Sequence, residues 1–323
     1  MLAVLLPIAL LGSSLAFQDA KANARTERET YKDGTPKLEQ QMREVSPGSW
    51  VADGPSTAYF PSGAKDYEGA WKAGKKDGPW TYWFQSGAKE AEGTYVSGSA
   101  EGPWIFYMER GNKIREGSFK SGKPEGKWTY WWFKSKEHEK GSASGEFVAG
   151  EMSGTWTYFD SDGKKREEGR MEHGKKEGPW TTWSASGQKT SEGPWKAGAQ
   201  DGTFKYWDEK GVPAKEGSYK AGREEGPWIY WYPNAQKQQE GSFRGGLEEG
   251  RWQFWNEDGK KSEEGTFAAG KAQGEWTHWY PDGTKKSQGS YAAGLATGAW
   301  SYWSADGGEK PKVEYAEGKP VQR

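Results

Sequence analysis

The stretch from Gly69 to Gly93 reads GAWKAGKKDGPWTYWFQSGAKEAEG, and most of the chain is built from copies of it. Each copy begins with a glycine, and in all copies but one an aromatic residue follows two positions later. Two further glycines follow, and then a dense aromatic run such as Trp80–Trp83. The first glycine recurs every 24 residues, with a single step of 28. The start glycines are Gly69, Gly93, Gly117, Gly145, Gly169, Gly193, Gly217, Gly241, Gly265 and Gly289. A fixed period of this length identifies a repeat array.

Composition excludes several classes of protein. The chain has 323 residues with 45 basic and 46 acidic side chains, a net charge of −1. This balance argues against binding to nucleic acid and against a charge-driven attachment to membrane lipid. Because the chain contains no cysteine, it has no disulfides, no thiolate metal ligands and no cysteine nucleophile.

Aromatic residues must supply the core. Leucine, isoleucine and valine are scarce after Phe17, whereas the chain holds 21 Trp, 16 Tyr and 12 Phe. Each of these rings can bury roughly 150–250 Å². A thin repeat array can therefore be stable without a thick aliphatic core.

The predicted secondary structure is β throughout. Short runs of aromatic and β-branched residues alternate with glycine-rich turns, which is the signal for strands and hairpins. Frequent glycines leave no uninterrupted helical stretch. We expect an all-β fold: an elongated array of about ten to eleven antiparallel β-hairpins, forming a twisted ribbon or solenoid-like sheet.

Alternation of side chains predicts which residues share a face of the sheet. It places Lys65, Tyr67 and Trp71 together, and it separates Trp80 from Trp83. Two rows of rings result. The first row is Trp80, Trp104, Trp128, Trp156, Trp180, Phe204, Trp228, Trp252, Trp276 and Trp300. The second row is Trp83, Tyr107, Trp131, Phe159, Trp183, Trp207, Trp231, Trp255, Trp279 and Trp303.

The two ends of the chain depart from the repeat. Residues 2–11 are apolar and precede small residues at Ser14 and Ala16, which indicates a secretory signal cut after Ala16. We therefore expect an exported protein: periplasmic, at the cell surface or extracellular. The predicted segments are a signal peptide 1–16, a flexible leader 17–30, a degenerate capping repeat 31–68, the array 69–306 and a C-terminal cap 307–323, within which residues 312–315 would form a closing edge strand.

The unit resembles the MORN repeat, and more closely its bacterial variant, whose members are often labelled YwqK-type antitoxins of toxin–antitoxin systems. The resemblance rests on glycine, aromatic, Gly-x-x-x-Gly and Trp-x-aromatic-aromatic elements and covers about residues 31–306. It implies stacked β-hairpins that serve as scaffolds or binding surfaces. An antitoxin function would require that the N-terminal run does not export the chain.

The candidate binding residues lie in the second row and in the one long repeat. Thr81 and its equivalents share the face of the second row, which predicts partial exposure of its rings. The long repeat replaces a tight turn by the charged loop Trp132–Lys140. The binding candidates are Trp83, Trp131, Trp132, His138, Trp183, Trp207, Trp231, Trp255, Trp279 and Trp303. A protein partner is the first expectation, a cell-wall polysaccharide stacked on the second row is the second, and a neutralised toxin is the third.

The sequence predicts no catalytic, cofactor or metal site. Acidic side chains recur in the Gly-x-x-x-Gly step, for example Asp77 and Glu101, and they are expected to form a solvated face. Asp160–Gly163 resembles the start of a calcium loop, but the later ligands are missing and the segment doubles as a hairpin turn. No triad or phosphate loop stands out from the repeat background, so we expect a protein that is not an enzyme.

Overall fold

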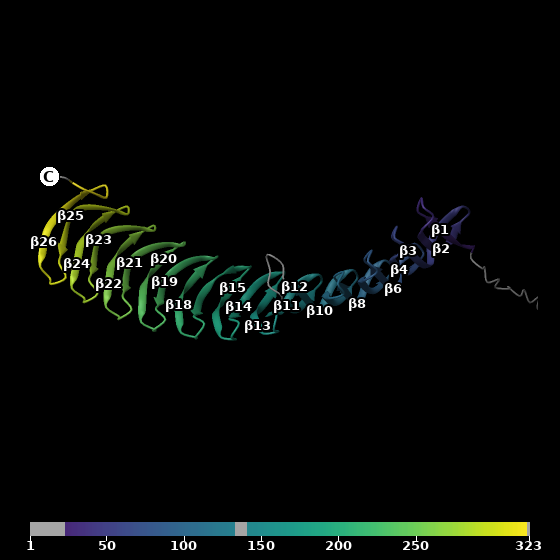
Figure 1. Cartoon of the computed structure of the whole chain (residues 1–323), viewed down its shortest axis with the longest axis horizontal. Helices are drawn as coiled ribbons and strands as arrows, with labels where there is room; N and C mark the ends of the chain where they lie inside the picture. The colour runs from purple at the N-terminus through teal and green to yellow at the C-terminus, as the bar shows by residue number, and fades with distance from the viewer. Residues whose placement is uncertain (1–22, 133–140, 322–323) are drawn as a thin grey trace, which may run out of the picture. The chain divides into compact units, whose positions relative to one another are not determined.

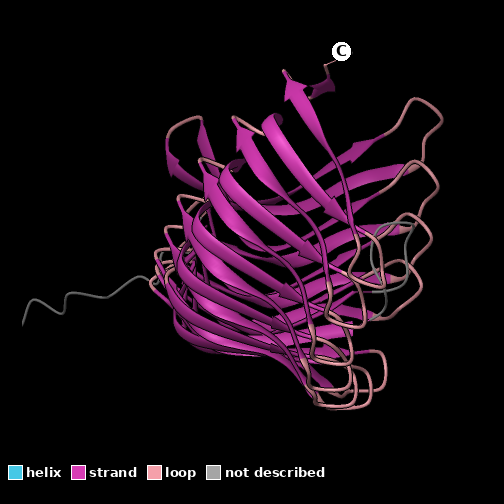
Figure 2. Cartoon of the chain, turned by 90° about the vertical axis from the view of Figure 1, so that its left-hand side faces the viewer, coloured by secondary structure: helices cyan, strands magenta, loops and turns pink. Residues whose placement is uncertain are grey.

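The computed structural model describes residues 23–132 and 141–321. Every regular element in these ranges is a β-strand, as predicted (Figures 1 and 2). The chain divides into two compact units. The N-terminal unit runs to Ser99 and includes Glu109–Gly111, and the C-terminal unit comprises Ala100–Met108 and the residues from Asn112 onward.

The N-terminal unit is a single antiparallel layer. Its strands are β1 (Ala24–Thr30), β2 (Pro36–Ser46), β3 (Ser49–Tyr59), β4 (Lys65–Lys72), β5 (Lys75–Lys76), β6 (Gly78–Trp83) and β7 (Lys89–Val96). Strand β1 pairs with β2 from Ala24 to Thr30. The flexible leader predicted for residues 17–30 is therefore wrong from Ala24 onward, because this segment finds a ladder partner in β2. The predicted signal peptide, residues 1–16, lies outside the described residues.

The C-terminal unit repeats the same hairpin. Its strands are β8 (Ser99–Tyr107), β9 (Lys113–Lys120), β10 (Lys123–Trp132), β11 (Gly141–Val148), β12 (Glu151–Asp160), β13 (Lys165–Glu172), β14 (Lys175–Trp183), β15 (Lys189–Lys196), β16 (Ala199–Gln200), β17 (Gly202–Trp207), β18 (Pro213–Lys220), β19 (Arg223–Trp231), β20 (Lys237–Arg244), β21 (Leu247–Trp255), β22 (Lys261–Ala268), β23 (Lys271–Trp279), β24 (Lys285–Ala292), β25 (Leu295–Trp303), β26 (Glu309–Ala316) and β27 (Lys319–Pro320). Residues 312–315, predicted to form a closing edge strand, lie in β26, which pairs with β25. The short strand β27 then pairs with the end of β26, at Tyr315 and Ala316.

The core of nearly every repeat is an indole lying across a bare glycine, and Phe204 takes the place of the indole over Gly193. The first row is buried throughout, with exposures from 0% for Trp228 to 5% for Trp276. A Cβ added at Gly217 would come within 2.1 Å of the Trp228 ring, so only glycine fits beneath it. The Trp228 Nε1 donates a hydrogen bond to the carbonyl of Ser218 at 3.1 Å. The glycine and the tryptophan of the repeat are thus two halves of one packing unit.

A bulge corrects one predicted face assignment. The ladder between β3 and β4 shifts register so that Tyr59 pairs with Lys65 and Asp66 is skipped. Lys65 therefore bonds Glu68 and faces the ring of Trp83, instead of sharing a face with Tyr67. Strict alternation fails here because a bulge adds one residue to a strand.

Candidate binding surfaces

The two faces of each sheet differ in what their rings contact. The aromatic face carries the buried first row together with flanking tyrosine, phenylalanine and tryptophan rings. The opposite face carries the second row and its lysine and glutamate neighbours. In the described parts of each unit the strands form one layer, so a second sheet covers neither face.

On the opposite face, the described second-row rings are half-buried rather than openly exposed. A lysine of the preceding strand lies over many of them and is itself paired with a glutamate. Lys237 Nζ, for example, lies 5.0 Å from the ring centroid of Trp255 and 2.7 Å from Glu240. The same arrangement places Lys65 over Trp83, Lys165 over Trp183, Lys189 over Trp207 and Lys261 over Trp279, at 5.2–5.5 Å. Lys285 lies over Trp303 at 5.2 Å and bonds Gln288 in place of a glutamate.

Several second-row positions differ from this pattern. The lysine position before Trp231 holds Pro213 and the one before Phe159 holds Gly141, so the sequence supplies no lysine at either position. Trp131 and its neighbour Trp132 end β10 and are half-buried. Trp132 packs against the buried cluster of Ala143, Trp156, Met171 and Trp180. His138 and most of the candidate loop lie outside the described residues.

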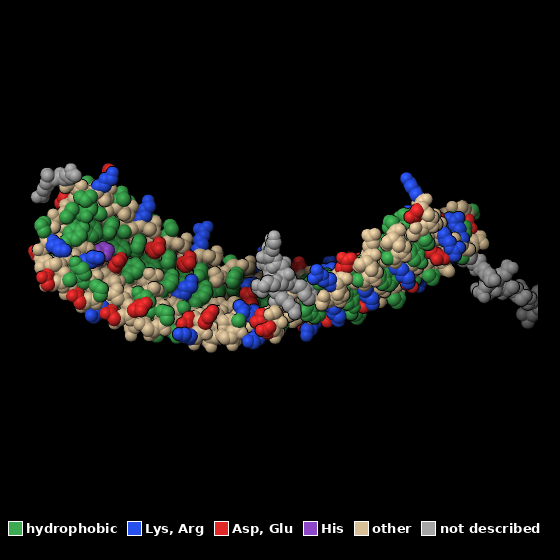
Figure 3. Space-filling model, in the orientation of Figure 1, with side chains coloured by type: hydrophobic (Ala, Val, Ile, Leu, Met, Phe, Trp, Pro, Cys, Tyr) green, Lys and Arg blue, Asp and Glu red, His purple; other side chains and the backbone are tan. Residues whose placement is uncertain are grey.

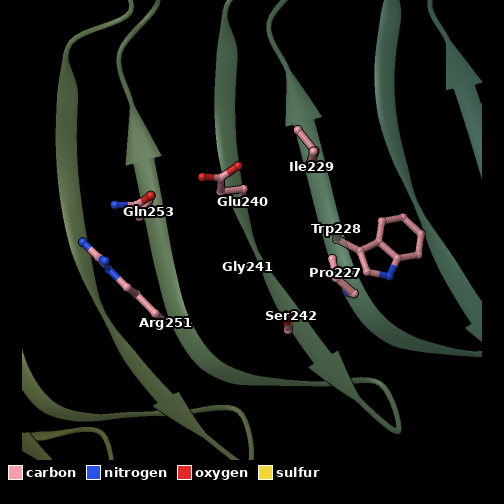
Figure 4. A pocket seen from close by; sticks show the side chains of 8 residues that line it. All are labelled: Pro227, Trp228, Ile229, Glu240, Gly241, Ser242, Arg251 and Gln253. Carbon is pink, nitrogen blue, oxygen red and sulfur yellow. The ribbon is translucent and has the colours of Figure 1, made fainter.

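Shallow hollows lie on the opposite face above the start glycines. One hollow of about 260 Å³ lies over Gly241, between Pro227 and Ile229 on one side and Arg251 and Gln253 on the other (Figure 4). An equivalent hollow of about 390 Å³ lies over Gly117. The hollows recur because a short serine side chain, Ser242 in one and Ser118 in the other, follows the start glycine.

A carboxylate network borders the hollow over Gly241. Glu264 Oε2 accepts hydrogen bonds from Lys261 at 2.7 Å, from Arg251 at 2.9 Å and from Gln253 at 3.0 Å. These contacts, that with Lys261 foremost, lower the pKa of Glu264 to about 2 against an opposing effect of burial. A bound sugar could form hydrogen bonds with these polar groups and stack on a half-buried ring of the same face, such as Trp255.

On the aromatic face, rings form a ladder along the C-terminal unit that is interrupted at Trp180, where Met171 replaces an aromatic residue. Most other buried first-row rings meet a ring of a neighbouring strand edge to face. Tyr219–Trp228, Phe243–Trp252, Phe267–Trp276 and Tyr291–Trp300 all have centroids 5.0–5.1 Å apart. Figure 3 shows hydrophobic side chains gathered over β20–β25.

The outer rings of this ladder are half-buried. They occupy the position two residues after the first-row ring and the position two residues after the start glycine. Tyr230, Phe243 and Phe254 are examples in β19–β21. Sequence reasoning missed these positions as candidates. The sequence did contain a signal for these positions, because an aromatic residue fills both of them in most repeats.

Some repeats place a cation on the aromatic face. Lys76 Nζ lies 4.3 Å from the Trp80 ring centroid and donates a hydrogen bond to the Tyr82 hydroxyl at 2.7 Å. Partial burial lowers the pKa of Lys76 and is the first cause that raises the pKa of Tyr82. Lys176, at the same repeat position, lies 4.2 Å from the Trp180 ring and pairs with Glu167.

The acidic residues of the Gly-x-x-x-Gly step have a structural partner. Each accepts a hydrogen bond from the first residue of the turn one repeat later, as Glu177 does from the Ala197 amide at 2.8 Å. The predicted solvated face is therefore wrong in part, because these carboxylates hold backbone amides. Within residues 23–132 and 141–321, no group of three or more acidic or histidine side chains could hold a metal ion. Nor does any helix in these ranges have the length and apolarity to cross a membrane.

Comparison with known proteins finds the repeat in the C-terminal unit. Residues 200–221, 248–269 and 272–293 match the family described as MORN repeat variant. No curated protein matches the chain. The three matched stretches agree with the hairpin array and carry no information about a partner.

Solved structures show only distant similarity. The Photorhabdus luminescens Tc holotoxin pore is 13% identical with a TM-score of 0.18, over 92% of this chain and 18% of that one. The TcdB2–TccC3 structure is 11% identical with a TM-score of 0.19, over 92% of this chain and 19% of that one. A eukaryotic initiation factor is 11% identical with a TM-score of 0.19, over 95% of this chain and 91% of that one. This chain thus spans less than a fifth of the two toxin structures, and such low TM-scores support no argument about function.

Proposed function

We propose that this MORN-repeat protein is a non-enzymatic scaffold that binds a protein partner along its aromatic face. The observation that carries the proposal is the ring ladder of the C-terminal unit, whose outer rings stay half-buried on a single-layer sheet. Rings such as Tyr230 and Phe254 are already held by their neighbours. They can therefore contribute binding energy with little loss of side-chain entropy.

The energetics favour this face over the opposite one for a protein. Aromatic residues dominate the centres of protein interfaces, where they are desolvated by the partner. On the opposite face, by contrast, Lys237 and its equivalents already lie over the second-row rings. A partner docking there would have to displace a lysine that is also paired with a glutamate.

A cell-wall polysaccharide on the opposite face is the second candidate function. It is favoured by the hollow over Gly241, which Arg251, Gln253 and Glu240 line with polar groups. Trp255, a half-buried ring, lies on the same strand as Arg251 and Gln253. Export to the cell envelope stays a prediction from residues 1–16. Neutralisation of a toxin would be a special case of protein binding, and it would require that the chain stays inside the cell.

Site-specific photo-cross-linking in the cells that make the protein tests these assignments. A benzophenone side chain replaces Phe254 on the aromatic face in one variant and Trp255 on the opposite face in a matched one. The proposal predicts a protein adduct from position 254 and none from position 255. An adduct from position 255 that stains for sugar would support the polysaccharide instead, and absence of adducts from both positions would contradict a scaffold function.

A further inference from the structure

One repeat position on the aromatic face indicates the charge of the partner. We call this position the cation slot. It is the seventh residue after the start glycine, and it faces the first-row ring of its own repeat. Lys76 fills it over Trp80, and Lys176 fills it over Trp180. In these two repeats the chain itself places an ammonium group among aromatic rings, where the ring faces attract it.

In β19 and β21 the cation slot holds a carboxylate instead. Glu224 pairs across the ladder with Tyr219, and Glu248 pairs with Phe243. Both glutamates are half-buried on the aromatic face. Among the described residues neither forms an ion pair, whereas Glu167 is paired with Lys176 and Glu263 has His278 at 3.7 Å.

The two carboxylates act on the same ring. Tyr230 lies on the stretch of the face that they share, with Trp228 stacked 5.8 Å away. Burial, and after it the negative charges of Glu224 and Glu248, together raise the pKa of Tyr230 to about 12. Lys215 is the ladder partner of Tyr230, and its ammonium lies over Tyr206 at 4.5 Å and over Trp228 at 5.4 Å. Among the described residues it forms no ion pair with Glu224 or Glu248.

We propose that β19–β22 bind an extended basic segment of a partner protein, whose lysine or arginine side chains pair with Glu224 and Glu248 beside the open rings. This inference rests on the proposed function and specifies the partner for that face. Charge complementarity carries it. Two half-buried carboxylates on an aromatic face, neither of which forms an ion pair within the described chain, are best satisfied by cations from a partner.

Repeat geometry sets the spacing of the basic residues. Glu224 and Glu248 are one repeat apart, which is two strands or about 10 Å. An extended chain advances about 3.3 Å per residue. Side chains of a β-strand alternate between two sides, so residues three apart share one side only in the polyproline II conformation, which has three residues per turn and a rise of about 3.1 Å per residue. A segment that crosses the strands in this extended conformation would present one basic side chain to each glutamate if the basic residues occur at every third position.

Fluorescence anisotropy with a synthetic peptide tests the proposal on the full chain. The probe carries lysine at every third position with serine and glycine between, and a second peptide of identical composition has its lysines in one block. We expect the spaced peptide to bind more tightly than the block peptide. Glu224→Gln with Glu248→Gln should weaken its binding about tenfold. Glutamine is compatible with the slot, because Gln200 occupies the same position and bonds Tyr206 at 3.3 Å.

A matched variant controls for net charge. Glu257→Gln with Glu275→Gln removes two exposed acidic side chains of the same region and should leave the affinity unchanged. Glu224→Lys with Glu248→Lys should abolish binding while the fold persists, since Lys76 and Lys176 already fill this slot. Equal weakening by both glutamine pairs, equal binding of both peptides, or no binding by the native chain would each overturn the proposal. If protein adducts still form at position 254, the scaffold function survives that failure.

Discussion

At the scale of single residues, the contact between a glycine and a first-row ring carries the stability of each repeat. Trp252 is 2% exposed, and its Nε1 donates to the Ser242 carbonyl at 3.2 Å. The ring lies flat on Gly241, where a Cβ would come within 2.1 Å of it. The backbone at Gly241 and the hydrogen bond to Ser242 therefore hold the Trp252 ring in one position, and the ring in turn holds the two strands together.

Replacement of that glycine should be costly. Gly241→Ala would push the Trp252 ring away from the strand, and we expect a loss of about 2 kcal/mol in the free energy of unfolding. Urea denaturation monitored by tryptophan fluorescence measures it. Ser242→Ala, one residue further along, keeps the carbonyl acceptor and serves as the control. Equal stability of the two variants would contradict the packing argument.

The ion network of Glu264 predicts a pH dependence. Its pKa is lowered from 4.5 to about 2 in the folded chain. The ionised carboxylate thus stabilises the fold fully above pH 4.5, and this contribution disappears as the pH falls toward 2. Because the group is partly exposed, the effect should be below about 1 kcal/mol. Glu264→Gln should flatten the stability profile in that window, and an unchanged profile would refute the assignment.

At the scale of the hairpin, the tight turns are held by side chains from the previous repeat. Ala197 and Gly198 both have positive φ, 51° and 89°, as a type I′ turn requires. Alanine is a poor residue at the first of these positions. The hydrogen bond that the Ala197 amide donates to the Glu177 carboxylate compensates, because it ties the turn to the previous repeat.

Removal of that acceptor should loosen one turn. Glu177→Ala leaves the Ala197 amide without its carboxylate partner, and a loss of about 1 kcal/mol is expected. Glu177→Gln should be nearly neutral, because Gln273 holds the Ala293 amide in the same way at 3.0 Å. Hydrogen exchange at the Ala197 amide distinguishes the variants. Equally fast exchange in both would mean that the glutamine oxygen cannot replace the carboxylate.

At the scale of the whole molecule, the C-terminal unit is a series of equivalent repeats, each of which pairs with the repeats before and after it. Strand pairs from β17 to β25 share the same ladder, bulge and ring contacts, for example between β19 and β20 and between β21 and β22. In such arrays stability depends mainly on contacts between adjacent repeats.

Deletion of one complete repeat should consequently be tolerated. Removal of residues 241–264 joins Glu240 to Gly265 and restores the sequence of a repeat start. The shortened protein should keep its β-sheet circular dichroism and cooperative melting. Removal of residues 241–252, half a repeat, would place Gln253 where a start glycine belongs and should unfold this region. Similar melting of the two deletions would show that repeat register is unimportant.

The sequence by itself determined the hairpin array, its period and the division of rings into two rows, because glycine spacing and aromatic alternation are local properties of the chain. It could not determine which row is buried. That depends on the indole of one strand lying on the glycine of the next, a contact between residues 11 apart, such as Gly217 and Trp228. Nor could it show that Lys65 changes face through a bulge or that acidic residues hold turns one repeat away. The unpaired state of Glu224 and Glu248 was likewise decided only by the tertiary structure, because ion pairing depends on which charges the neighbouring strands bring close.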